Sequence, residues 1–221
     1  MIADNIKQIQ NTITKYKQVE DVTFVAVTKT RSIEDIKEVV ATGVVDLGEN
    51  RVQELLEKYP HFDKNIRWHL IGTLQKNKVK YIIDKVHLIH SVDSISLLEE
   101  INSQAKKNGI CMNVLLQLNI SKEESKHGFY EENIVEAIQT ASNFENIKVV
   151  GLMTMAPDTE DIAIIRNIFK KIRNIFDDLM QISEKYGNIE MCILSMGMSN
   201  DFELALKEKS NLIRVGRIIY K

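Results

Sequence analysis

Hydrophobic positions along this chain fall into short runs that alternate with longer stretches in which apolar residues recur at helical spacing. The short runs are rich in Val, Ile and Leu, and they predict buried strands at residues 22–29, 44–49, 67–72, 86–92, 112–120, 148–155, 190–197 and 211–220. The stretches between them predict helices at residues 32–42, 50–59, 74–84, 94–107, 130–142, 158–186 and 200–209. This strict alternation is typical of a parallel sheet with helices packed outside it.

Eight such units in a chain of 221 residues predict the α/β class and a closed (β/α)8 TIM barrel in place of an open sheet. The last predicted strand runs almost to Lys221, so we expect no helix after it. Isoleucines at helical spacing give residues 2–13 one apolar face, which predicts an extra N-terminal helix that fills this gap in the ring. No Gly/Ser-rich linker interrupts residues 1–221, which we interpret as a single domain.

Residues that cap helices well stand before several predicted helices. Ser32 begins one helix, with Asp35 three residues later, and Asp158 is predicted to cap the long helix that follows it. These caps support the predicted helix starts.

The composition of the chain limits the kinds of binding partner and the cellular compartment that we expect. The formal net charge is −2, so no global positive field exists to gather nucleic acid, and no segment is long and apolar enough to span a membrane. Cys111 and Cys192 lie far apart and form no C-x-x-C pair, which predicts neither a disulfide framework nor a metal site. We therefore expect a cytoplasmic protein that binds a small molecule and neither nucleic acid nor a membrane.

Lys29 is the most informative residue for chemistry. It ends the apolar, β-branched run of residues 22–29, where we expect its side chain to be partly desolvated. Desolvation disfavours the ammonium form, so the amine would be available as a nucleophile, as in Schiff-base lysines. The alternative is a structural lysine whose stem lines the strand end and whose head reaches water.

The loops after the seventh and eighth predicted strands form a second candidate, since barrels commonly bind phosphate there. Ser195, Met196, Gly197 and Ser199 lie in a hydroxyl-rich turn before a helix, whose backbone N–H groups could hold an anion. An ordinary helix cap would explain the turn equally well. The segment from residue 214 to 216, Arg-x-Gly, adds a cation and a bare backbone on the next strand, and this favours a phosphate site.

Five sequence blocks resemble the pyridoxal phosphate homeostasis protein family, also called the proline synthetase co-transcribed family, which is similar to the barrel domain of alanine racemase. They occur in the family's order along nearly the entire chain, at residues 25–29 (VAVTK), 48–54 (GENRVQE), 68–78 (WHLIGTLQKNK), 151–155 (GLMTM) and 194–199 (LSMGMS). The resemblance implies that the chain binds pyridoxal 5′-phosphate. It also implies the residues that contact this cofactor: Lys29, Asn50, His69, Ser195, Met196, Gly197, Ser199, Arg214, Gly216 and Arg217.

The resemblance assigns separate roles within this set. Lys29 takes the place of the aldimine lysine, and Ser195, Ser199, Gly216 and the backbone of Arg217 would hold the phosphate. Arg214 would face the pyridine nitrogen. Because arginine cannot accept a proton, it would keep that nitrogen unprotonated and weaken the cofactor as an electron sink.

A racemase needs two bases, and Lys29 supplies only one of them. In alanine racemases the second is a tyrosine from a separate domain, which we expect to be absent here, and none of the tyrosines in this sequence is obviously placed to replace it. We therefore expect a non-catalytic binder or carrier that acts in vitamin B6 and amino-acid homeostasis. The alternative is a slow amino-acid racemase in which water or His69 serves the second face.

Partners beyond the cofactor are less defined by the sequence. We expect a monomer that makes transient contact with pyridoxal-phosphate-dependent enzymes. Residues 75–78 (Gln-Lys-Asn-Lys) lie in a block shared with the family and could help to hand over the cofactor. The basic run from Lys76 to Lys80 could instead touch RNA or an acidic protein, although a solvated helix face explains it more simply.

Overall fold

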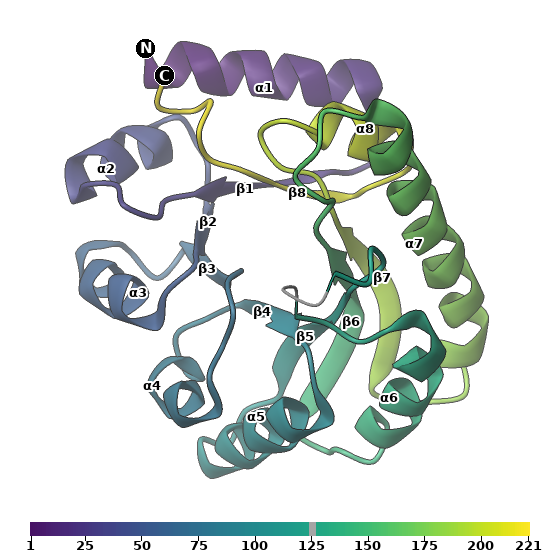
Figure 1. Cartoon of the computed structure of the whole chain (residues 1–221). Helices are drawn as coiled ribbons and strands as arrows, with labels where there is room; N and C mark the ends of the chain where they lie inside the picture. Colours follow the sequence, from purple (N-terminus) through teal and green to yellow (C-terminus); the bar gives the residue numbers. More distant parts are fainter. Residues whose placement is uncertain (124–126) are drawn as a thin grey trace.

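The computed structural model describes residues 1–123 and 127–221, which form eight parallel strands closed into a barrel in chain order (Figure 1). The strands are β1 (Thr23–Val27), β2 (Asp46–Glu49), β3 (Arg67–Leu70), β4 (Leu88–Val92), β5 (Met112–Leu118), β6 (Ile147–Thr154), β7 (Ile189–Ser195) and β8 (Leu212–Val215). The α-helices are α1 (Ile2–Tyr16), α2 (Ile33–Ala41), α3 (Val52–Lys58), α4 (Val79–Ile82), α5 (Ile95–Lys107), α6 (Ile134–Ala141), α7 (Ile162–Ser183) and α8 (Phe202–Lys207). The 3-10 helices are η1 (Tyr59–His61), η2 (Lys76–Lys78) and η3 (Glu131–Asn133). The predicted barrel is confirmed.

Helix α1 closes the ring beside β1 and β8, where the last strand has no helix of its own (Figure 1). It packs against α2 and α8 and buries Ile6, Ile9 and Ile13. The side-chain amide of Asn5 donates hydrogen bonds to the backbone oxygens of Ile219 (3.0 Å) and Lys221 (3.0 Å). The N-terminal helix therefore fills the predicted gap and holds the C-terminal segment in place.

Some strands and helices end at other residues than predicted. Strand β8 ends at Val215, not near residue 220, because the Gly216 N–H donates to the Ser199 hydroxyl at 3.2 Å. The predicted helix at 74–84 is shorter, because Gln75 is extended and the next three residues form η2. Ser32 caps α2 as predicted, since its hydroxyl accepts from the Asp35 N–H.

The predicted cap of the long helix is wrong. Helix α7 begins at Ile162, and the Asp161 carboxylate accepts from the N–H groups of Ala163 (2.9 Å) and Ile164 (3.3 Å). Asp158 lies three residues upstream in the loop after β6. Both aspartates suit a cap position, so only the backbone path decides which one serves.

Two apolar layers hold the barrel. The larger fills the space between the strands and the helices, and a smaller cluster inside the barrel contains Val25, Leu88, Leu115, Val150, Met153 and Leu212. Buried polar side chains share the interior with this small cluster. Among the residues that the structure describes, no helix has both the length and the apolar character needed to cross a membrane.

Candidate functional site

A cavity of about 520 Å³ lies at the mouth of the barrel formed by the carboxyl ends of the strands. Predicted cofactor contacts that line it are Lys29, Asn50, Ser199, Arg214, Gly216 and Arg217. The loop after β6 adds residues 155–159, which were not predicted as contacts. Among the described residues around this cavity, His69, Ser195, Met196 and Gly197 do not form its lining.

Lys29 lies two residues beyond the end of β1, and its side chain is exposed. The expectation that the strand end would desolvate it is therefore wrong, because β1 stops at Val27 and the chain leaves the sheet there. Lys29 nevertheless lines the cavity. Its amine is accessible to a molecule bound at the barrel mouth.

The backbone on both sides of Lys29 is held by the Lys58 cluster, which consists of Thr28, Thr30, Glu49, Glu54 and Lys58. The Lys58 ammonium donates to the Thr28 carbonyl oxygen at 2.8 Å and to the Glu49 carboxylate at 2.6 Å. It also lies 3.4 Å from a Glu54 oxygen, and that same oxygen accepts the Thr30 N–H at 2.8 Å. The cluster thus fixes the residues before and after Lys29, while the Lys29 side chain itself is exposed.

Burial and hydrogen bonding set the charges in this cluster. Burial raises the pKa of Glu49, and hydrogen bonds from Lys58 and Thr28 offset only part of that effect. The Thr30 N–H is the main reason that the pKa of Glu54 is lowered. Thr30 itself adopts a φ of 60°, which is unfavourable for a β-branched residue. We conclude that the bond to Glu54 helps to hold Thr30 in this strained conformation.

The loops after β7 and β8 are joined to each other at the cavity. The Ser199 hydroxyl accepts the Gly216 N–H at 3.2 Å, and the Gly197 carbonyl oxygen accepts the Arg214 N–H at 3.0 Å. Gly197 has a φ of 97°, and a Cβ atom there would lie 2.6 Å from the Ala205 Cβ. This turn therefore requires glycine for both its backbone angle and its close contact with α8.

One N–H of the predicted phosphate turn is already bonded within the turn. Asp201, which is buried, accepts the Met198 N–H at 2.5 Å. Burial raises the pKa of Asp201, and the Met198 N–H opposes this rise. The Gly216 N–H is likewise bonded to Ser199, so the donors left to face a bound anion include the Ser199 O–H group and the exposed Arg217, both of which line the cavity.

Arg214 lines the cavity although it is only 3% exposed. Its guanidinium donates to the Ser195 hydroxyl at 2.5 Å and to the Thr154 carbonyl oxygen at 3.0 Å. Burial lowers the pKa of Arg214 to about 10, so the group remains a cation at neutral pH. The cavity thus has a buried, hydrogen-bonded cation on β8 and an exposed amine that follows β1.

His69 lies in the barrel interior and is 2% exposed. Its Nε2 atom is 2.9 Å from an Asp46 carboxylate oxygen, and its Nδ1 atom is 2.9 Å from Nε2 of His90. Both ring nitrogens are therefore engaged with protein groups, so this geometry gives no support for His69 as a cofactor contact or as a second base. Asp46 and His90 were not predicted. The signal in the sequence was their place on apolar strands, where a polar residue that faces inward needs a partner.

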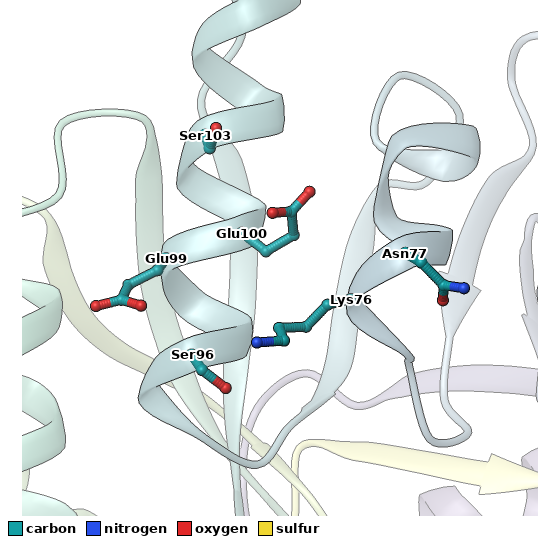
Figure 2. A pocket seen from close by; sticks show the side chains of 6 residues that line it. All are labelled: Lys76, Asn77, Ser96, Glu99, Glu100 and Ser103. Atoms are coloured by element: carbon teal, nitrogen blue, oxygen red, sulfur yellow. The ribbon is translucent and has the colours of Figure 1, made fainter.

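Residues 75–78 lie outside this cavity, on the outer ring of helices. A second pocket of about 390 Å³ separates η2 from α5, and Figure 2 shows the Lys76 side chain pointing toward α5 near Ser96. Glu99 and Glu100 line the same pocket, whereas the Asn77 side chain points away from α5 (Figure 2). Acidic residues thus lie close to the predicted basic run, which weakens the case for RNA binding there.

Known proteins share both the sequence and the fold. Residues 1–221 match the family described as alanine racemase, N-terminal domain. The chain is 42% identical to the pyridoxal phosphate homeostasis protein of Aquifex aeolicus (strain VF5) over 193 residues, which cover 87% of this chain and 83% of the relative. It is 35% identical over 219 residues to the protein of the same name from Helicobacter pylori (strain ATCC 700392 / 26695), covering 98% and 95% of the two chains.

Solved structures extend the comparison to three dimensions. PipY of Synechococcus elongatus PCC7942, solved with pyridoxal phosphate bound, has a TM-score of 0.88 and 29% identity, and the alignment covers 100% of both chains. Alanine racemase of Clostridium difficile 630 has a TM-score of 0.76 and 19% identity, covering 98% of this chain and 55% of that one. At that level of identity the likeness to alanine racemase shows the fold alone.

Proposed function

The chain belongs to the pyridoxal phosphate homeostasis protein family, and from this premise we propose that it binds pyridoxal 5′-phosphate in the cavity at the barrel mouth. The observation that carries the proposal is the cavity lining. The exposed Lys29 follows β1, and the buried Arg214 lies on the neighbouring strand β8. Both residues line the same cavity. PipY, which is similar over its entire length, has been solved with this cofactor bound.

The residues present fit the chemical groups of this cofactor. The Lys29 amine would condense with the aldehyde carbon, forming a C=N bond and releasing water. Ser199 and the backbone at residues 216–217 would hold the phosphate, and Ser195, Met196 and Gly197 would support that loop from behind. The bound cofactor supplies a reactive carbonyl group and an electron-withdrawing ring. Arg214 would donate toward the ring nitrogen without protonating it, and Asn50 would contact the ring from the end of β2.

A visible absorption band tests the covalent link. The protein loaded with pyridoxal phosphate should absorb in the visible range, and borohydride reduction followed by peptide mapping should place the cofactor on Lys29. Lys29→Ala should lose the band. Lys64→Ala, a change at another exposed lysine, should keep it. A parent protein without the band, or a reduced adduct on another residue, would contradict the proposal.

We propose that the bound cofactor serves vitamin B6 and amino-acid homeostasis without robust catalysis. The names of the relatives support this role. Among the described residues that line the cavity there is no tyrosine to act as a second base, and Asp158 and Asp201 are its carboxylates. Incubation with single enantiomers of amino acids in deuterium oxide separates the two functions, because appreciable α-deuterium incorporation or inversion would establish the slow racemase instead.

We also propose a cytoplasmic monomer that passes the cofactor to dependent enzymes. Sedimentation at several protein concentrations would test the oligomeric state. Transfer would be followed as recovery of activity by a cofactor-free dependent enzyme that is mixed with the loaded protein. If the dependent enzyme recovers activity no faster with the loaded protein than with an equal concentration of free cofactor, the carrier role is wrong.

A further inference from the structure

Polar side chains on five strands form a continuous line across the barrel interior. We call it the interior chain, and its members are Asp46, His69, His90, Ser195 and Arg214. Successive polar atoms lie 2.9 Å apart from Asp46 to His69, 2.9 Å from His69 to His90, 3.0 Å from His90 to Ser195 and 2.5 Å from Ser195 to Arg214. All five residues are buried, between 0% and 6% exposed.

The two ends of the interior chain determine its direction. Asp46 is bonded through both oxygens to Arg67, at 2.7 and 2.5 Å, so it can only accept from His69 Nε2. Burial alone would raise the pKa of Asp46, but hydrogen bonds from His69 and Arg67 outweigh it and lower the pKa. At the other end, a guanidinium can only donate, so Ser195 accepts from Arg214.

Charge balance decides the state of the two histidines between these ends. The charges of Asp46 and Arg67 already cancel, so a protonated His69 would add a buried and uncompensated positive charge. The titratable and charged groups that face the pair are Asp46, Arg67, His87 and Arg214. Arg67 and Arg214 are cations, and the Asp46 carboxylate is already paired with Arg67, so the neutral form of the histidine pair is favoured.

Neutral histidines leave a single arrangement of hydrogens. His69 donates through Nε2 to Asp46, so its Nδ1 atom accepts from Nε2–H of His90. His90 then has a bare Nδ1 atom, which accepts from the Ser195 hydroxyl. Every bond therefore points the same way, from Arg214 to Asp46, and both ring nitrogens of each histidine have a partner.

We propose that Asp46, His69, His90 and Ser195 are positioning residues for Arg214, which they hold toward the cavity through this one-directional hydrogen-bond chain. As far as it concerns the cofactor, the inference rests on the proposed function, since it assumes that Arg214 meets the ring nitrogen. The interior chain also links the cavity to Arg67, whose partly exposed side chain lies at the start of β3. A change at the far end of the barrel would therefore reach the cofactor pocket through hydrogen bonds alone.

The first experiment uses the cofactor-free protein and depends on no ligand. Histidine side chains labelled with ¹⁵N would be assigned with single His variants, and their tautomers read from long-range proton–nitrogen correlations. At neutral pH, His69 and His90 should both be Nε2–H tautomers, with His69 donating to Asp46 and His90 donating to His69. An Nδ1–H tautomer or a charged ring at either interior position would overturn the inference.

The second experiment breaks the link between His90 and Arg214. Ser195→Ala removes the hydroxyl that joins them, Ser195→Thr keeps it, and Ser91→Ala is a control that removes a buried hydroxyl outside the interior chain. Ser195→Ala should change the His90 nitrogen shifts and the Arg214 guanidinium signals and weaken pyridoxal phosphate binding about ten-fold. Ser195→Thr should restore all three. Ser91→Ala should change none of them.

The outcomes separate this inference from the proposed function. If Ser195→Ala leaves the Arg214 signals and the binding of pyridoxal phosphate unchanged, the positioning role is wrong while the cofactor assignment stands. If Lys29→Ala binds the cofactor as the parent does, the proposed function fails. The tautomers and the Arg214 signals of the cofactor-free protein then still decide whether the interior chain exists.

Discussion

The Lys58 cluster, in which Lys58 and Glu49 are buried, and the fully buried interior chain are both groups of charged and hydrogen-bonded side chains, and they hold different parts of the same cavity. The cluster lies against α3 and binds the backbone at Thr28 and Thr30, so the Lys29 side chain between them stays exposed. The interior chain lies inside the barrel and binds the side chain of Arg214, which is 3% exposed. One network thus holds a backbone and leaves the side chain of Lys29 exposed, whereas the other holds a side chain.

This difference matches the chemistry that we propose for each residue. A lysine that forms and releases a covalent bond has to rotate and change its protonation state, so rigid contacts to its amine would hinder it. An arginine that only orients a ring needs a fixed direction, and a buried hydrogen-bond chain supplies one. The Lys58 cluster also leaves one buried oxygen unsatisfied, because the Glu49 Oε2 atom has no hydrogen-bond partner among the described residues.

Removal of the Lys58 ammonium should have the largest effect on stability. Lys58→Met leaves the buried Glu49 without its cation, and we expect a loss of about 3–5 kcal/mol in the free energy of unfolding. Urea unfolding at neutral pH would measure it, with Lys64→Met as an exposed control. The double variant Glu49→Gln with Lys58→Met should recover part of the loss, because no buried charge is then unpaired. A loss below about 1 kcal/mol in the single variant would show that the cluster does not depend on this ion pair.

A methyl group at Gly197 tests the backbone on the Arg214 side of the cavity. The positive φ and the contact with Ala205 should together cost about 2–3 kcal/mol in Gly197→Ala. The matched control is Gly187→Ala, since a Cβ atom at Gly187 meets nothing within 4 Å. Urea unfolding of both variants gives the comparison. Equal stability of the two would mean that the turn after β7 adapts easily.

The pH dependence of stability tests the interior chain through His90. Burial, followed by the charges of His69, Arg214 and His87, holds the pKa of His90 well below its ordinary value near 6.5. The unfolded chain therefore binds a proton more readily below about pH 6.5, so stability should fall as the pH is lowered, by up to about 1.4 kcal/mol per pH unit. Urea unfolding between about pH 7 and about pH 5 would give this slope.

The variant His90→Asn isolates the histidine's share of that slope. It should be less stable at neutral pH, but its stability should depend less on pH, because the titrating ring is gone. Asp46, with its lowered pKa, would still lose its contribution at lower pH. Parallel slopes for the parent and the variant would show that His90 does not resist protonation in the folded protein.

The smallest expected effect concerns the strain beside Lys29. Asparagine tolerates a positive φ better than threonine, so Thr30→Asn should raise the free energy of unfolding by about 0.5–1 kcal/mol. Thr14→Asn, on the exposed side of α1, should give no gain, because a helix requires a negative φ. Chemical denaturation of both variants provides the test. A loss of stability in Thr30→Asn would indicate that the threonine side chain packs usefully in this conformation.

The sequence predicted the barrel because its evidence is local and repeated. Apolar runs that alternate with helical periodicity identify the strands, and the apolar face of residues 2–13 predicted the helix that closes the ring. The same reasoning predicted that Lys29, Arg214 and Gly216 would meet, because the ends of neighbouring parallel strands lie at one mouth. It failed for the exposure of Lys29, since a strand's last residue depends on ladder hydrogen bonds that the apolar pattern does not report.

Only the tertiary structure decided which buried polar groups are partners. His90 and Ser195 are 105 positions apart in the chain, and Lys58 reaches Glu49 across the space between a helix and a strand. A period of two residues tells which side of a strand a side chain faces, but not its rotamer or its partner across the barrel. The sequence by itself thus determined the scaffold and the residues at its mouth. Only the closed barrel decided how Arg214 is held and how the backbone around Lys29 is held, because these depend on side-chain contacts between separate strands and helices.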